Sequence, residues 1–73
     1  MISEEQAVAA ARRIAEQEGW AWADPALATL RKGWSGRGGR WEILSNARAL
    51  GAKVRVLLDA DSGTVIEKGY VPR

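Results

Sequence analysis

The feature that most constrains the fold is a short helix, predicted over residues 3–19, whose apolar stripe consists mostly of alanine. Ser3 is a favourable N-cap residue, and Gln6 three positions later completes a capping-box pattern. Gly19 is the residue type at which helices commonly end. Alanine side chains are small, so this helix must lie close to the surface that it covers, and a sheet with larger residues would suit it. The stripe comprises Ala7, Val8, Ala11, Ile14 and Ala15.

The rest of the chain alternates apolar and polar residues in the manner of β-strands. The clearest strand is KVRVLLD, residues 53–59, followed by the turn sequence DADSG and by a returning strand, TVIEKGYV, over 64–71. RWEILSN, residues 40–46, and the stretch 28–34 are also predicted as strands. We therefore predict one α+β domain over residues 1–73, with one N-terminal helix packed on a three- to four-stranded antiparallel sheet.

The alternation also predicts which side chains share a face. Trp41, Ile43 and Ser45 should point to one side of their strand, and Glu42 to the other. Glu42 lies in a basic stretch, so we expect it to pair with a cross-strand arginine such as Arg55 rather than to act as an acid or base.

Composition argues against catalysis and against a bound cofactor. The chain has 73 residues and contains neither histidine nor cysteine, so the commonest general base, the usual metal ligands and the best nucleophile are absent. We expect a non-enzymatic protein without cofactors or metals. The N-terminal sequence lacks a signal-peptide pattern and no segment is apolar enough to span a membrane, so a cytoplasmic location and no membrane partner are expected.

The turn sequence DADSG has the spacing that opens a calcium loop, since Asp59 and Asp61 stand two apart. The pattern then fails, because Gly63 and Thr64 occupy the positions of a ligand and of a glycine, and Tyr70 replaces the bidentate glutamate. Aspartate, serine and glycine are ordinary turn residues, and Gly63 is free to adopt a positive φ. We interpret the sequence as a turn.

The net charge of +2 is unevenly distributed along the chain. Residues 31–55 carry a net charge of +6, with Glu42 as the one acidic residue, whereas residues 1–30 carry −3 and residues 56–73 carry −1. A basic middle between acidic ends could bind an anionic partner. It could equally form solvated strand faces that complement an acidic helix.

Four tryptophans and no phenylalanine are unusual in so small a domain. Tryptophan serves at half-buried positions and interfaces, since it has a large apolar body and an N–H group that needs an acceptor. Trp41 is predicted in the core and Trp22 at one end of the sheet, whereas Trp34 is expected to be the most exposed. The sequence does not place Trp20.

The segment KGWSGRGGRW, residues 32–41, allows three interpretations. The simplest is a hairpin connection whose glycines supply positive φ values and whose arginine keeps the tip soluble. The segment could also contact a protein. A nucleic-acid loop would combine basic and aromatic residues in the same way, but arginine–glycine tracts act through many repeats and this chain has one copy.

The order of these elements resembles the PepSY domain. The resemblance is carried by the helix start SEEQA, by the strand RWEIL with its aromatic-x-hydrophobic step, and by VRVLLDADSGTVI, a strand, an Asp-x-x-Ser/Thr-Gly turn and a returning strand. It implies a helix against an antiparallel sheet, no catalytic residues, and a role such as the inhibition associated with metallopeptidase propeptides. In size and layout the chain is also similar to small bacterial immunity proteins that bind a toxin.

From these patterns we predict a small protein-binding module, an inhibitor or immunity-type protein whose partner is an enzyme or toxin. Tryptophan and arginine are the residues most often found as interface hot spots. A nucleic-acid-binding module that uses the same basic segment is the alternative, and a homodimer formed through a sheet edge is a third possibility. The predicted partner-binding residues are Trp34, Arg37, Arg40, Arg48 and Arg55.

Overall fold

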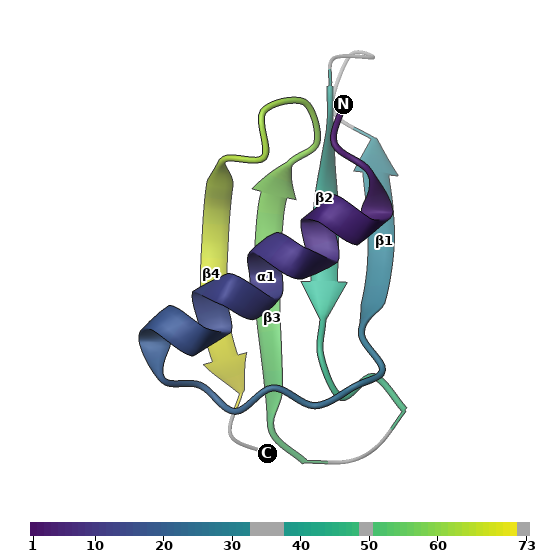
Figure 1. Ribbon diagram of the computed structural model, residues 1–73. Coiled ribbons are helices and arrows are strands. Elements are labelled where there is room, and N and C mark those ends of the chain that lie inside the picture. The colour runs from purple at the N-terminus through teal and green to yellow at the C-terminus, as the bar shows by residue number, and fades with distance from the viewer. Residues whose placement is uncertain (33–37, 49–50, 72–73) are drawn as a thin grey trace.

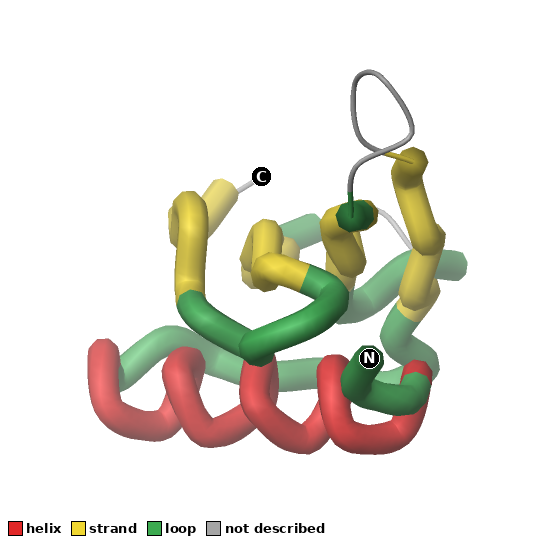
Figure 2. Tube along the Cα trace, turned by 90° about the horizontal axis from the view of Figure 1, so that it is seen from above, coloured by secondary structure: helices red, strands yellow, loops and turns green. Residues whose placement is uncertain are grey.

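The computed structural model describes residues 1–32, 38–48 and 51–71, and it confirms the predicted fold class. One helix, α1 (Glu4–Glu18), lies across one face of a sheet in which neighbouring strands are antiparallel and follow the chain order (Figure 1). Seen along the sheet, no described element covers the other face (Figure 2). The strands are β1 (Leu27–Lys32), β2 (Gly39–Leu44), β3 (Lys53–Asp59) and β4 (Val65–Val71).

Both ends of α1 form as the sequence predicts. Ser3 and Gln6 make a reciprocal capping box, in which each side chain accepts a hydrogen bond from the other residue's backbone N–H. At the other end Gly19 adopts a left-handed conformation with φ 75°, and the N–H of Trp20 donates to the carbonyl of Ala15 at 2.8 Å. This pairing is a Schellman motif, which satisfies carbonyl groups that the last turn leaves free.

The core lies between α1 and the covered face of the sheet. Ala7, Ala11 and Ala15 are fully buried, so the backbone of α1 lies against the sheet as the alanine stripe predicts. The large side chains come from the sheet, with Ile43 and Leu58 fully buried. The predicted face of β2 is confirmed as well, since the remaining members of its alternating set, Trp41 and Ser45, are both buried.

The segment between α1 and β1 returns across the lower end of the covered face and holds the loop that follows β2 (Figure 1). The N–H of Asn46 donates to the carbonyl of Ala23 at 2.7 Å, and that of Ala47 donates to Pro25 at 3.0 Å. Ser45 is fully buried, and its hydroxyl oxygen accepts a 2.8 Å hydrogen bond from the N–H of Val54. The start of this loop is therefore part of the folded framework.

The strand predicted over residues 28–34 is β1, which begins one residue earlier, at Leu27, and is described as far as Lys32. The remainder of that prediction lies outside the described residues. Of the described residues, no helical segment combines the length and the apolar character needed to cross a bilayer.

Candidate functional surface

The uncovered side of the sheet, here called the open face, carries a row of charged side chains that crosses all four strands. Arg31 on β1 and Arg55 on β3 both bind Glu42 on β2, with shortest nitrogen–oxygen distances of 2.8 Å and 3.0 Å. Arg55 also reaches Glu67 on β4, at 3.3 Å from Nη1 to Oε1. We call these four residues the arginine–glutamate belt. The predicted pairing of Glu42 with Arg55 is confirmed, and Arg31 is a second partner.

The belt surrounds an apolar residue of the same face. Leu57 lies directly between Glu42 and Glu67 in the strand register, and only 8% of its surface is exposed. Because it points away from α1, its burial comes from neighbouring side chains on the open face. The aliphatic parts of Arg55 and of the two glutamates can cover it while their charged groups stay in water. The belt therefore shields a small apolar site as well as pairing charges.

Charge pairing also fixes the ionisation of Glu42. The hydrogen bond from Arg31 is the largest cause that lowers the pKa of this carboxyl below its ordinary value, and Arg55 adds to the shift, while partial burial acts in the opposite direction. The Glu42 side chain is 18% exposed, so it is less hydrated than the arginines that bind it. Glu42 is consequently ionised at neutral pH and serves as a structural anion rather than a proton donor.

A basic end of the open face lies where β1 finishes and β2 begins. Arg31 is directly opposite Arg40 in the register of these two strands, so two like charges share one cross-strand position. Such pairs are destabilising unless another charge offsets them. Glu42 offsets Arg31, whereas Arg40 is exposed and forms no ion pair within the described part of the chain. Lys32, also exposed, is the next residue of β1. Neighbouring residues of a strand point to opposite faces, so Lys32 does not share the open face, and we call Arg31 and Arg40 the basic end.

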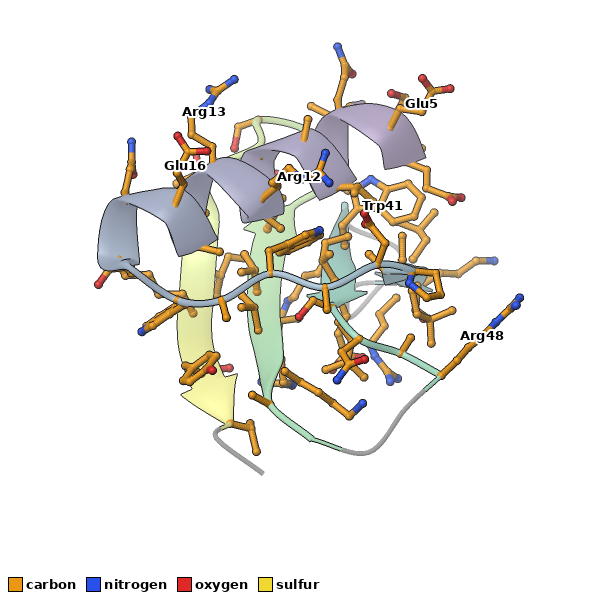
Figure 3. All side chains as sticks on the ribbon, turned by 60° about the horizontal axis from the view of Figure 1, so that its bottom comes forward. Glu5, Arg12, Arg13, Glu16, Trp41 and Arg48 are labelled. Atoms are coloured by element: carbon orange, nitrogen blue, oxygen red, sulfur yellow. The ribbon has the colours of Figure 1, made fainter. Side chains whose placement is uncertain are left out.

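The structure separates the residues predicted from sequence as one binding surface. Arg40 is the second residue of β2, whereas Arg48 lies beyond the other end of that strand and points away from the sheet (Figure 3). Arg55 lies on the open face but is bound to two glutamates in the belt. Trp34 and Arg37 lie outside the described residues. Arg40, Arg48 and Arg55 therefore do not form a single described patch.

The described tryptophans have roles within the fold. Trp41 lies beneath α1 (Figure 3), is 9% exposed, and donates its indole N–H to the carbonyl of Ile2 at 3.2 Å, which confirms the prediction of a core residue. Trp20, which the sequence does not place, stacks on Tyr70 with ring centroids 5.9 Å apart. Trp22 packs against the edge of the core. Of the four tryptophans, Trp34 is therefore the one that remains a candidate interface residue.

Trp22 belongs to a small surface cluster beside α1. Its indole N–H donates to Asp24 at 3.1 Å, and the guanidinium of Arg12 lies 5.9 Å from the centre of its ring. Arg12 also forms an ion pair with Asp24, at 3.1 Å. The indole N–H of Trp22 and both carboxylate oxygens of Asp24 have partners inside the chain, so the cluster links α1 to the segment that returns from it.

The DADSG sequence forms a turn, as predicted. The Asp59 carboxylate accepts hydrogen bonds from the backbone N–H groups of Asp61, at 2.8 Å, and Ser62, at 3.0 Å, and Gly63 has φ 79°. The hydrogen bond from Ser62, followed by that from Asp61, lowers the pKa of Asp59. Among residues 1–32, 38–48 and 51–71, no cluster of three or more acidic side chains is arranged to hold a metal ion.

Sequence reasoning missed Arg31 as a member of the candidate surface. The signal was present in the sequence, because a hairpin between the segments 28–34 and 40–46 must bring basic residues at their facing ends together. What was lacking was the register, which places Arg31 opposite Arg40. Alternation within one strand does not fix that pairing.

Comparisons of the chain with protein-family models, with curated proteins and with solved structures gave no match. The PepSY-like resemblance therefore stays a prediction from the sequence. A proposal for the function of this chain has to rest on the geometry and charge of the open face.

Proposed function

We propose that this chain is a non-enzymatic protein-binding module of the inhibitor or immunity type, which binds an acidic surface of a partner enzyme or toxin through its basic end. The observation that carries the proposal is the cross-strand pair of like charges at Arg31 and Arg40, of which Glu42 binds Arg31, on a sheet face that no described element covers. Trp34 and Arg37 belong to the same proposal, because they occur in the chain between these two arginines.

Binding an acidic partner would remove an electrostatic cost that the free chain carries. A carboxylate placed between Arg31 and Arg40 would offset both guanidinium groups, whereas Glu42 now offsets one of them. Arginine can bind a carboxylate through two parallel hydrogen bonds and is common among interface hot spots. Arg40 has no ion pair to break within the described chain, so its charge is available to a partner.

A protein partner suits the open face better than a nucleic acid. The acidic side chains of Glu42 and Glu67 lie on this face among the arginines, and Asp59 is directly opposite Arg40 on β3. A phosphate backbone gains affinity from a continuous basic surface and would be repelled by these carboxylates. A protein surface can present charges of both signs in a matching arrangement.

Arg40 and Arg48 provide a matched pair of variants for the test. Both are exposed arginines at opposite ends of β2, and neither forms an ion pair within the described residues. Proteins captured from the cells that express the chain would be identified by mass spectrometry, purified and titrated against the variants. We expect Arg40→Glu to weaken binding at least tenfold, about 1.4 kcal/mol, and Arg48→Glu to bind like the parent chain. An enzymatic or toxic activity of the partner should fall on binding.

Two results would overturn the proposal. Equal affinities of the Arg40→Glu and Arg48→Glu variants for the purified protein would remove the basic end from the interface. Binding of single-stranded RNA or DNA at physiological salt, with a steep loss of affinity as salt rises, would instead establish the nucleic-acid alternative. The same variants serve in both measurements, so the two classes of partner are distinguished with one set of proteins.

A further inference from the structure

The second edge of the sheet, β4, has no neighbouring strand within the described chain and carries apolar side chains in solvent. Val65, Ile66 and Val71 are 41%, 48% and 46% exposed. The outer side of an edge strand presents unpaired N–H and C=O groups, which are a template for another strand. This edge lies on the opposite side of the sheet from the basic end, so it concerns a separate surface (Figure 1).

The charges on the two edges determine which of them can accept a second copy of the same chain. The outer strand β1 carries Arg31 and Lys32 and no acidic residue, so each copy of β1 would bring a net charge of +2 to the pairing. The strand β4 carries Glu67 and Lys68, and its net charge is zero. Lys68 is moreover bound to Glu18 of α1 at 2.7 Å, which offsets the charge that would otherwise discourage pairing at this edge.

The register shows which backbone groups of β4 point outward. The carbonyl of Val54 accepts a hydrogen bond from the N–H of Ser45, so Val54 directs its backbone groups toward the β2 side. The direction of the backbone groups alternates along a strand, so Arg55 and Leu57 direct theirs toward β4. Their partners there are Gly69 and Glu67. The residues of β4 that alternate with these two, Lys68 and Tyr70, therefore direct their N–H and C=O groups away from the sheet.

We propose that β4 pairs in antiparallel fashion with β4 of a second copy, about a twofold axis at Lys68, to form one continuous eight-stranded sheet. This register keeps each sheet face continuous, because it joins residues of the same face. Ile66, which the bulge between Glu67 and Val65 leaves without a partner on β3, comes next to Tyr70 of the second copy, so two apolar surfaces meet. Glu67 lies opposite Gly69 of the second copy, and Lys68 lies opposite its own copy with its charge offset by Glu18.

The position of Gly69 gives this register its charge complementarity. A side chain at Gly69 would contact nothing within 4 Å, so the space above it on the open face is empty. Arg55 is the residue directly opposite Gly69 on β3. In the dimer, Glu67 therefore faces Arg55 of the second copy across the empty position. The alternation of arginine and glutamate that forms the belt then continues through the interface.

The helix layer is compatible with the same arrangement. The last turn of α1 extends past the β4 edge in both views (Figures 1 and 2). It lies on the side of the sheet where Glu18 binds Lys68. A second β4 added at this edge would pass under that turn, and the twofold axis at Lys68 would bring its Ile66 there. The turn would then cover an apolar side chain that is 48% exposed in the single chain.

Light scattering and sedimentation over a range of protein concentrations test the dimer, and cysteine pairs test its register. The parent chain has no cysteine, so introduced thiols are the only ones. Glu67→Cys/Gly69→Cys places two thiols directly across the proposed interface, within the range of a cross-strand disulfide. We expect twice the monomer mass and a covalent dimer on mild oxidation. Two control variants should stay unlinked. Glu67→Cys/Val71→Cys tests a shifted register, and Thr29→Cys tests the other edge of the sheet.

A single substitution tests whether the apolar contact of Ile66 contributes to dimerisation. Ile66→Lys changes an exposed side chain and should leave the monomer folded while it weakens dimerisation at least tenfold. A parent chain that stays monomeric at high concentration overturns the proposal, as does faster linkage of either control cysteine variant. Because β4 lies apart from the basic end, failure of the dimer leaves the proposed function standing, and loss of partner binding in Arg40→Glu leaves the dimer standing.

Discussion

The two faces of the sheet bury apolar residues by different means. On the covered face, the backbone of α1 lies close to the strands because fully buried Ala7 and Ala11 allow it, and large side chains such as Ile43 fill the space. On the open face, Leu57 reaches 8% exposure without a covering element in the described chain, because ion-paired side chains surround it. One face depends on close packing of apolar groups, and the other on charged side chains held in place by one another.

Because of this difference, the stability of the two faces depends on different solution conditions. Packing of alanine against a sheet is insensitive to pH and to salt, whereas the belt depends on ionised carboxylates and is weakened by screening. It also indicates where a partner can bind without unfolding the chain. The covered face is closed by α1, while the open face already carries polar groups that can exchange an internal ion pair for an external one.

Removal of the largest side chain from the covered face should have the largest effect on stability. Trp41→Ala would leave a cavity beneath α1 and remove the hydrogen bond to Ile2, so we expect a loss of about 3–5 kcal/mol in the free energy of unfolding. Chemical denaturation followed by circular dichroism measures it. Trp41→Phe keeps most of the volume and should lose clearly less. Equal losses for the two variants would contradict the packing explanation.

The corresponding change on the open face should cost less. Leu57→Ala removes a buried side chain, but the surrounding arginine and glutamates can close over the gap, so we expect about 2 kcal/mol, the low end for such substitutions. The same denaturation experiment applies. A cost as large as that of Trp41→Ala would mean that Leu57 belongs to a rigid core and that the two faces do not differ in the proposed way.

The belt predicts a pH dependence that the covered face lacks. The pKa of Glu42 is lowered in the folded chain, so the unfolded chain takes up the proton first as the pH falls below about 4.3, the ordinary glutamate value. The stabilisation is thus complete at neutral pH and is lost as the pH falls toward the lower folded value. We expect Glu42→Gln to cost about 1 kcal/mol at pH 7 and to flatten the loss of stability on acidification.

Denaturation of the parent chain and of Glu42→Gln at pH 7 and pH 3 tests this sign. The difference between the two proteins should shrink at the lower pH. Asp59, whose pKa is also lowered, retains its hydrogen bonds in the variant and keeps part of the acid sensitivity. A difference that grows on acidification would show that Glu42 does not act as an ion-paired carboxylate.

The sequence predicted most of the fold because its signals are local. A capping box at Ser3, a glycine stop at Gly19 and a strict alternation through Trp41 and Ile43 each depend on neighbouring residues, and each is confirmed. The pairing of Glu42 with Arg55 was also predicted, since one carboxylate in a basic stretch has few other partners. These features need no knowledge of how the strands are aligned.

The candidate surface was predicted less completely because it depends on register and on distant contacts. Nothing local to Arg48 indicates that it lies at the other end of β2 from Arg40, or that its loop is anchored by the segment after α1. The stacking of Trp20 on Tyr70 joins residues 50 positions apart and leaves no pattern in either segment. The combined belt emerges only when four strands are placed side by side.

The smallest expected effect concerns the residues that the proposed function needs. Arg40 and Arg48 are exposed and form no ion pair within the described chain, so Arg40→Ala and Arg48→Ala should each change stability by no more than about 0.5 kcal/mol. Arg40→Ala should be neutral or slightly stabilising, since it relieves the repulsion from Arg31 across β1 and β2. Thermal and chemical denaturation measure both. A loss above 1 kcal/mol at Arg40 would mean that its guanidinium supports the fold through a residue such as Asp59, which lies opposite it on β3. The arginine pair would then lose its value as evidence for a partner.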